Sequence, residues 1–230
     1  MSLLAHRPRA VAFDINETLF ELSGLRLHFE TLGLPPYALE WWFAVLLRDG
    51  MALAAAGDAA PFSTLAVVAL DEVSARADRQ LPRRAASELL AAFAELPAHP
   101  DVAPALELLV EAGIPAIGLT NGSAATTDML IERARLSALV SRVLSVEDVG
   151  HWKPRPEPYR FAARQAGVQP ERLAMVAVHP WDLHGAAVSG LVTGWVNRTG
   201  RRFPAVFTHP HLQAPSLDVV VAKLLDLPER

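Results

Sequence analysis

The alternation of apolar and polar residues divides the chain into three sections. The first is the run from Val11 to Phe20, apolar on both sides of Asp14, which is typical of a buried strand that ends at a carboxylate. Residues 23–97 follow with helical periodicity and almost no strand signal, and we expect helices near 35–57, 64–76 and 82–95. From Pro100 onward, helical segments alternate with apolar runs of strand length.

This last section predicts helices and strands in turn. The expected order is helix 102–112, strand 114–119, helix 124–135, strand 143–146, helix 156–166, strand 173–178, helix 181–190 and strand 191–196. We expect an edge strand at 217–221 before a C-terminal helix, and a long loop at 203–215. The rhythm predicts an α/β fold, a doubly wound parallel sheet with a Rossmann-like core formed by residues 1–20 and 98–230. Residues 21–97 would be a helical cap inserted after the first strand.

Composition and charge restrict the class of protein. The chain is 51% hydrophobic and 20% charged, which favours a folded domain over a disordered one. A net charge of -4 without a basic run gives no expectation of a nucleic-acid partner. The absence of cysteine excludes disulfides, thiolate catalysis and cysteine-based zinc sites. We find no apolar run of membrane-spanning length and no signal sequence in residues 1–10, so we expect a cytoplasmic protein without membrane contact.

Four segments at strand ends or helix starts carry polar side chains. They are Asp14, residues 120–123 (TNGS), Lys153 and residues 179–182 (HPWD). The carboxyl ends of parallel strands meet at one edge of a sheet, so we expect these segments to converge. Asp14 taken alone fits a helix N-cap equally well. The other three polar segments favour its place in a functional site at the edge of the sheet.

The converging residue types suit covalent catalysis by a carboxylate. Such a nucleophile needs a nearby cation that keeps it ionised, and donors for the oxyanion that forms when its ester is cleaved. Lys153 is the candidate cation, and Asp182 is the candidate base that directs water at the ester. The candidate donors are Thr18, Thr120 and the amides around Asn121.

The order of these motifs resembles the haloacid dehalogenase superfamily over essentially the whole chain. Three further features resemble its type II 2-haloacid dehalogenases. The helical insert directly follows the first motif, Tyr159 stands six residues after Lys153, and residues 181–186 (WDLHGA) resemble the Trp-Asp-x-x-Gly-Ala segment of that family. The resemblance makes Asp14 the nucleophile, Thr18 the threonine of the first motif, Thr120 the counterpart of a serine and Asn121 the asparagine after it.

The resemblance implies an SN2 attack by Asp14 on a halogen-bearing carbon. Water then cleaves the resulting ester, and a small 2-haloacid becomes a 2-hydroxy acid without a cofactor. The residues that the resemblance and the motifs suggest for substrate binding are Ile15, Asn16, Trp42, Arg48, Tyr159, His179 and Trp181.

Two alternative functions remain open at this stage. A magnesium-dependent phosphatase of the same superfamily would carry an aspartate where this chain has Asn16 and an acidic residue where it has Val178. Asn16 cannot act as a general acid, and magnesium requires several hard oxygen ligands. We therefore expect no metal. The other alternative is a binding or regulatory protein that has the fold with altered chemistry.

Several residues depart from the dehalogenase pattern. Asn16-Glu17 stands where Tyr-Gly is common, Ala177 replaces a serine, and His179 replaces an asparagine on the halide side. His179 fits either a hydrogen-bond donor to ester or halide, or a packed or capping residue.

The position of the family's cap arginine, directly after a tryptophan, is Phe43 in this chain. The nearest arginine, Arg48, is turned about 140° from Phe43 on a continuous helix, and fits either the crevice or the solvated surface. The paired Trp41 and Trp42 fit either a homodimer contact or core packing.

Overall fold

The computed structural model describes residues 5–229. Residues 1–4 and Arg230 lie outside this range. The expectation that residues 1–10 contain no signal sequence therefore falls partly outside the described residues. Six strands form one parallel sheet in the order β3-β2-β1-β4-β5-β6. Their bounds are β1 Ala10–Phe13, β2 Ala116–Thr120, β3 Arg142–Ser145, β4 Leu173–Ala177, β5 Val192–Val196 and β6 Leu212–Ala214. Every residue of β1, β2, β4 and β5 is buried, as expected for a parallel sheet covered on both faces.

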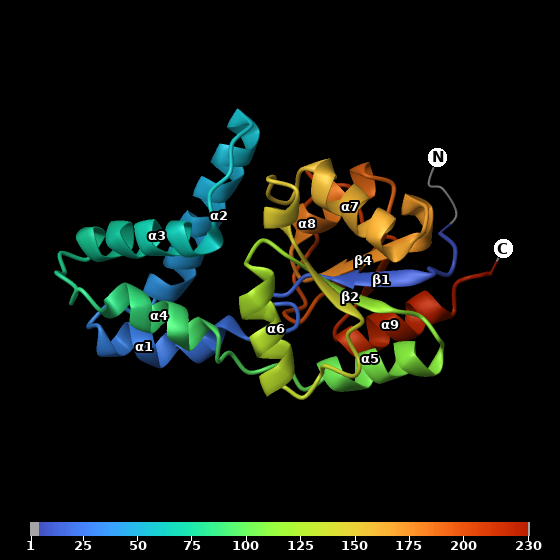
Figure 1. Cartoon of the computed structure of the whole chain (residues 1–230), viewed down its shortest axis with the longest axis horizontal. Helices are drawn as coiled ribbons and strands as arrows, with labels where there is room; N and C mark the ends of the chain where they lie inside the picture. Colours follow the sequence, from blue (N-terminus) through green and yellow to red (C-terminus); the bar gives the residue numbers. More distant parts are fainter. Residues whose placement is uncertain (1–4, 230) are drawn as a thin grey trace.

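Helices cover both faces of the sheet (Figure 1). One layer contains α5 (Val102–Glu111), α6 (Ala124–Arg133) and α9 (Leu217–Leu225), and the other contains α7 (Pro156–Ala166) and α8 (Pro180–Val188). Side chains of β1 alternate between the two layers. Val11 and Phe13 belong to the hydrophobic cluster on the side of α5, α6 and α9, and Ala10 and Ala12 belong to the cluster on the side of α7 and α8. The expected α/β fold with a doubly wound parallel sheet is confirmed.

The chain between β1 and β2 is helical. It contains the 3-10 turn η1 (Leu22–Leu25) and helices α1 (Arg26–Thr31), α2 (Ala38–Ala56), α3 (Phe62–Arg76) and α4 (Ala85–Phe93). These helices lie beside the sheet, on the left in Figure 1. Trp42 of α2 is fully buried, and its indole N–H donates to the carbonyl of Ala66 in α3 (2.8 Å). The cap boundaries at residues 21 and 97 stay a prediction.

Two elements near the C-terminus differ from the sequence prediction. Residues 217–221 are the start of α9 and not an edge strand, because Leu217, Val220, Val221 and Leu224 are buried at helical spacing. The edge strand is instead β6, which lies inside the expected loop 203–215. The remaining short turns are η2 (Val146–Asp148) and η3 (Pro170–Arg172).

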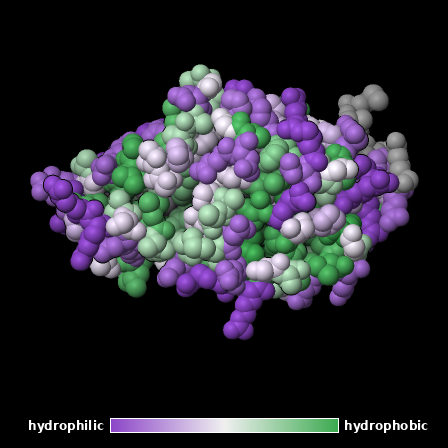
Figure 2. Space-filling model, in the orientation of Figure 1, coloured by the Kyte–Doolittle hydropathy of each residue, from purple (hydrophilic) through white to green (hydrophobic). Residues whose placement is uncertain are grey.

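Hydrophobic and hydrophilic residues alternate on the molecular surface that Figure 2 presents. Figure 2 shows apolar and polar side chains interspersed over the face that it presents. Within residues 5–229, none of the helices is long and apolar enough to cross a membrane.

Trp152 joins the cap helices to the loop that carries Lys153. Its indole N–H donates to the carbonyl of Ala60 (3.0 Å), and its ring stacks on Phe62 with centroids 6.3 Å apart. A Cβ on Gly50 of α2 would lie 2.5 Å from this buried ring. Gly50 therefore allows close approach of α2 to the Trp152 loop.

We predict that Gly50→Ala destabilises the protein. Overpacking against a buried ring costs about 1–3 kcal/mol, which outweighs the roughly 1 kcal/mol that alanine gains over glycine in a helix. Thermal unfolding should show a melting temperature lower by a few degrees, at about 2–4 °C per kcal/mol. Ala52→Gly, at an exposed position of the same helix, measures the helix-propensity contribution alone. An unchanged or higher melting temperature for Gly50→Ala would contradict the close packing of Gly50 against the Trp152 ring.

Candidate active site

Asp14 directly follows β1 at the carboxyl edge of the sheet. Its backbone N–H donates to the carbonyl of Val176 in β4 (3.1 Å), which aligns the residue with the neighbouring strand. The Thr18 hydroxyl donates to Asp14 Oδ2 (2.8 Å) and accepts the backbone N–H of Val178 (3.1 Å). The turn after β1 thus fixes one oxygen of a carboxylate that is only 5% exposed.

Lys153 lies between two carboxylates. Its Nζ is 2.8 Å from Asp14 Oδ1, 2.7 Å from Asp182 Oδ2 and 2.9 Å from the carbonyl of Leu119. Its backbone N–H donates to Asn121 Oδ1 (3.0 Å), which ties the lysine loop to the end of β2. Burial disfavours the ammonium, but the attraction of the two carboxylates outweighs this cost and raises the pKa of Lys153. The lysine is therefore charged.

The two carboxylates differ in their electrostatics. Burial opposes ionisation of Asp14, but Lys153 and the hydrogen bond from His179 hold its pKa well below the usual range. Burial and the nearby Asp14 charge raise the pKa of Asp182, against the pull of Lys153. Asp182 also accepts from the Tyr159 hydroxyl at both Oδ1 (2.6 Å) and its backbone carbonyl (3.0 Å). Separated pKa values are a common property of paired catalytic carboxylates.

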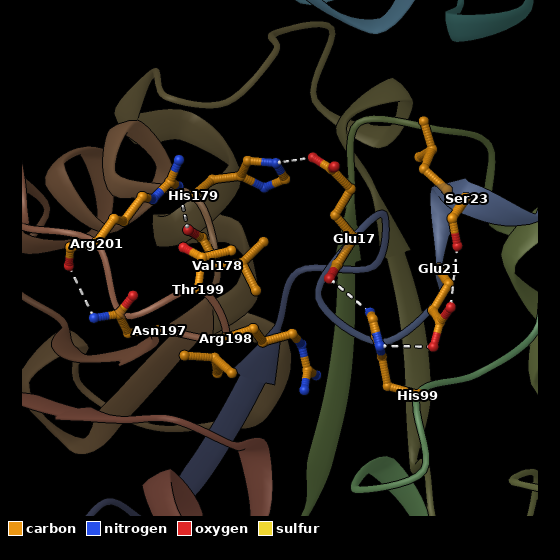
Figure 3. A pocket seen from close by; sticks show the side chains of 12 residues that line it. Glu17, Glu21, Ser23, His99, Val178, His179, Asn197, Arg198, Thr199 and Arg201 are labelled. Carbon is orange, nitrogen blue, oxygen red and sulfur yellow. Dashed lines mark hydrogen bonds and ion pairs between the residues drawn. The ribbon is translucent and has the colours of Figure 1, made fainter. Parts of the chain in front are cut away.

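His179 bridges two acidic side chains. Its Nδ1 is 2.9 Å from Asp14 Oδ2. Its Nε2 is 2.8 Å from Glu17 Oε2, and Figure 3 shows this second contact. Burial disfavours the imidazolium, yet the hydrogen bonds and charges of Asp14 and Glu17 raise the pKa of His179 to about 9. With two anionic partners, the protonated ring donates at both nitrogens.

The structure brings most of the predicted residues together. Thr120, buried at the end of β2, accepts the backbone N–H of Gly122 at its hydroxyl (2.9 Å). Ile15 is buried beneath the turn after β1 and lies close to Gly118 of β2. The ring of Trp181 is tilted against that of His179, with centroids 5.2 Å apart.

Two predicted substrate-binding residues lie away from this cluster. Trp42 is fully buried among the rings of Phe29, Phe43 and Phe93 in the cap. Arg48 has a side chain 54% exposed and pairs with Asp49 (2.8 Å) and Glu72 (2.7 Å). Phe43 reaches the site instead, with its ring centroid 6.1 Å from that of His179.

Two cavities border the cluster. The first, of about 240 Å³, lies between core residues Asn16 and Thr120 and cap residues that include Phe62, Leu90 and Phe93. The second, of about 350 Å³, is drawn in Figure 3. Its lining contains Glu17, His179, His99, Arg198 and Arg201. Within residues 5–229, no group of three or more His, Cys, Asp or Glu side chains is arranged to hold a metal ion.

Comparison with known proteins identifies the family. The family model described as haloacid dehalogenase-like hydrolase matches residues 8–190. The chain belongs to this family. Among solved structures, an L-2-haloacid dehalogenase superposes with a TM-score of 0.89 and 29% identity, covering 94% of this chain and 98% of that one. The expected likeness to type II 2-haloacid dehalogenases is confirmed.

Curated relatives of this chain match over part of their length. (S)-2-Haloacid dehalogenase 4A of Burkholderia cepacia is 36% identical over 112 residues, which is 49% of this chain and 48% of that protein. Haloacetate dehalogenase H-2 of Moraxella sp. (strain B) is 28% identical over 136 residues, 59% of this chain and 61% of that protein. The matched region thus spans about half to three fifths of these relatives.

The sequence did not reveal the pairing of Glu17 with His179. Both residues stood out as departures from the dehalogenase pattern, but they are 162 positions apart and no local signal connects them. In the sequence, Phe43 is distinguished only as the residue at the position of the family's cap arginine. Its place opposite His179 depends on how α2 packs over the core.

We predict that His179 makes the stability of this protein pH-dependent. Its folded pKa of about 9 exceeds the ordinary value of 6.5, so the folded protein keeps a proton that the unfolded chain releases in this range. The stabilisation from the protonated His179 side chain is fully present at pH values below its ordinary pKa. It is lost as the pH rises through the pKa of the folded state. Urea unfolding across this window should show a decline of about 1–3 kcal/mol in the free energy of unfolding. His179→Gln should flatten the decline, and equal slopes in both proteins would contradict it.

Proposed function

We propose that this hydrolase cleaves the carbon–halogen bond of small 2-haloacids, such as haloacetates or 2-haloalkanoates, through an ester of Asp14. The observation that carries the proposal is the buried, ionised Asp14 carboxylate held against the Lys153 ammonium at 2.8 Å. Desolvation makes a carboxylate a stronger nucleophile, and the fixed ammonium keeps it ionised and oriented. The names of the relatives, which are 2-haloacid and haloacetate dehalogenases, support the same reaction class.

In the first step, an Asp14 oxygen would attack the carbon that bears the halogen. A carbon–oxygen bond forms, the carbon–halogen bond breaks, and the halide leaves with the bonding electrons. In the second step, water attacks the carbonyl carbon of the Asp14 ester, and the 2-hydroxy acid is released. Lys153 Nζ lies within hydrogen-bond distance of Asp14 Oδ1 and would stabilise the oxyanion of this step.

The cavity between core and cap is the proposed substrate site. Its volume of about 240 Å³ is below the range of roughly 300–1,000 Å³ typical of pockets for drug-sized ligands, and fits a two- or three-carbon acid. Phe62, Leu90 and Phe93 give it an apolar wall for the halogen-bearing carbon. Ser123 and Thr126 in the same lining lie at the N-terminus of α6, where the helix dipole favours a substrate carboxylate.

We assign roles to the predicted residues on this basis. Asp14 is the nucleophile, Lys153 its cation, and Thr18 the donor that orients Oδ2. Asp182 and Tyr159 hold Lys153 in place, and Asn121 fixes the lysine backbone. Thr120 and Asn16 line the proposed substrate cavity. A cytoplasmic location, a homodimer and the absence of a cofactor stay predictions.

We predict that Asp14→Ala abolishes halide release and leaves the fold intact. Lys153 retains Asp182 and His179 retains Glu17, so no charge is left without a partner. Halide should be measured from chloroacetate, fluoroacetate and both enantiomers of 2-chloropropionate, with EDTA present. Asp128→Ala, on the exposed face of α6, is the matched control. Wild-type release without Asp14 would refute the nucleophile. Phosphate release restored by magnesium, with no halide from any acid, would favour the phosphatase alternative.

We predict that Lys153→Ala lowers turnover by at least about a hundredfold, since the ammonium both orients the nucleophile and stabilises the oxyanion. The variant should also be less stable by about 3–5 kcal/mol, because Asp14 and Asp182 lose the charge between them. Circular dichroism and urea unfolding separate the two effects. Lys223→Ala is a matched control, because Lys153 and Lys223 are the two lysines of the sequence and Lys223 Nζ donates to the backbone carbonyl of Gln213 at an exposed position. Turnover near the wild-type rate would show that Lys153 has a packing role.

A further inference from the structure

We propose that Arg198, in the loop after β5, is a positioning residue for the Asp14 nucleophile and acts through the backbone of Thr18. It would hold the turn that carries the Thr18 hydroxyl, and with it the two chain segments that join the cap to the core. The inference rests on the proposed function. It adds to that function a residue that lies outside the proposed substrate cavity.

The guanidinium of Arg198 makes three hydrogen bonds to two segments. Nη1 donates to Asp101 Oδ2 (2.5 Å), and Nη2 donates both to Asp101 Oδ1 (3.1 Å) and to the carbonyl of Thr18 (3.0 Å). The Arg198 and Asp101 side chains are mostly buried, with 22% and 13% of their surfaces exposed. In Figure 3 the Arg198 side chain extends from its loop toward His99. The paired contacts with Asp101 use the planar fork of arginine and fix its orientation toward Thr18.

Thr18 connects this carbonyl contact to the nucleophile. Its hydroxyl donates to Asp14 Oδ2 (2.8 Å) and accepts the backbone N–H of Val178 (3.1 Å). Thr18 is fully buried, and its hydroxyl and carbonyl belong to one residue, so a shift of its backbone moves the hydroxyl relative to Asp14. A misplacement of about 1 Å can lower the rate of a reaction about a hundredfold. Arg198 therefore fixes Thr18 from the side opposite to the nucleophile.

Asp101 anchors the arginine to the core. Its Oδ2 also accepts the backbone N–H of Leu217 at the start of α9 (2.8 Å), and Asp101 itself directly precedes α5. Burial opposes ionisation of Asp101, but the hydrogen bonds from Arg198 and from this N–H hold its pKa below its usual value. The guanidinium thus joins the turn after β1 to two helices that pack on the sheet.

The two segments between cap and core meet beside this arginine. The N–H of Glu21 donates to the carbonyl of Pro97 (2.8 Å), and the N–H of His99 donates to the carbonyl of Leu19 (2.9 Å). The segments therefore run side by side, and Arg198 binds the core end of each. A cap that moves would pull on the first segment, which leads directly into the turn of the nucleophile. The arginine holds that turn in place.

The alternative is an arginine that does no more than neutralise the buried Asp101 carboxylate. Arg198→Lys separates the two roles. The lysine ammonium keeps a positive charge beside Asp101 but lacks the fork that binds Asp101 and the Thr18 carbonyl together. A neutralising role predicts that lysine restores the activity, whereas a positioning role predicts that it does not.

The kinetic test uses chloroacetate as the probe. Rapid-quench experiments would measure the maximal rate of chloride release and the chloroacetate concentration that gives half of it. In Arg198→Lys we expect the maximal rate to fall at least about tenfold and the half-saturating concentration to change by less than about twofold, because substrate contacts are retained. Arg202→Lys, at an exposed position of the same loop, is the matched control and should leave both values unchanged.

Thr18→Val provides a double-mutant cycle. It removes the hydroxyl through which Arg198 would act, so the further addition of Arg198→Lys should lower the remaining rate by less than about twofold. Multiplicative effects of the two substitutions would show that they act independently and would overturn the positioning role.

Hydrogen exchange gives a readout that does not require activity. The Val178 N–H is bonded to the Thr18 hydroxyl, so it should exchange at least about tenfold faster in Arg198→Lys. The Ser141 N–H, which donates to the carbonyl of Ala116 (2.8 Å) before β3, should exchange at the wild-type rate. If Arg198→Lys does not fold, Asp101→Asn releases the fork from the other side and should give the same faster exchange.

The two readouts separate the possible failures. A wild-type rate of chloride release in Arg198→Lys, or unchanged exchange of the Val178 N–H, would overturn the role of Arg198 and leave the proposed function intact. Absence of chloride from the wild-type protein would overturn the proposed function, and with it the role of Arg198 in catalysis. Faster exchange at Val178 would then support only the contact between Arg198 and the Thr18 turn.

Discussion

The ammonium of Lys153, buried between Asp14 and Asp182, is the interaction on which the rest of the site depends. Taking three charges out of water costs several kcal/mol per ion, and only complete pairing offsets that cost. The three charged groups come from the end of β1, the start of α8 and the loop before α7, and the carbonyl of Leu119 in β2 is the third contact of the ammonium. The parallel sheet brings all of these to one edge. This arrangement keeps the carboxylate of Asp14, the proposed nucleophile, ionised.

Local periodicity was sufficient to predict the core of the fold. Strands buried on both faces and helices with an apolar stripe have distinct patterns, and β2, β4 and β5 lie within two residues of their expected bounds. The prediction failed where the pattern is too short to be diagnostic. β6 has only three residues, and the Val-rich start of α9 resembles a strand until Leu224 is counted on the same face. Tertiary packing decided both cases.

Some residues of the candidate site are predictable from the sequence, and others are not. Asp14, Thr18, Lys153 and Asp182 follow from motif spacing, because their positions are fixed by the ends of regular elements. Contacts that depend on the cap or on distant loops do not. Arg48 is a candidate for substrate binding as the arginine nearest to Phe43, but in the structure its side chain pairs with Asp49 and Glu72. The partner of His179 could not be inferred either, since Glu17 required a left-handed backbone that its residue type does not suggest.

The two oxygens of Asp14 face cations of different kinds. Lys153 is paired with Asp182 as well as with Asp14, so it keeps one carboxylate partner when Asp14 becomes an ester in the proposed reaction. His179 has Asp14 for one of its two anionic contacts and Glu17 for the other. In the proposed reaction the buried ammonium would therefore stay beside the ester, where it would stabilise the oxyanion of the second step.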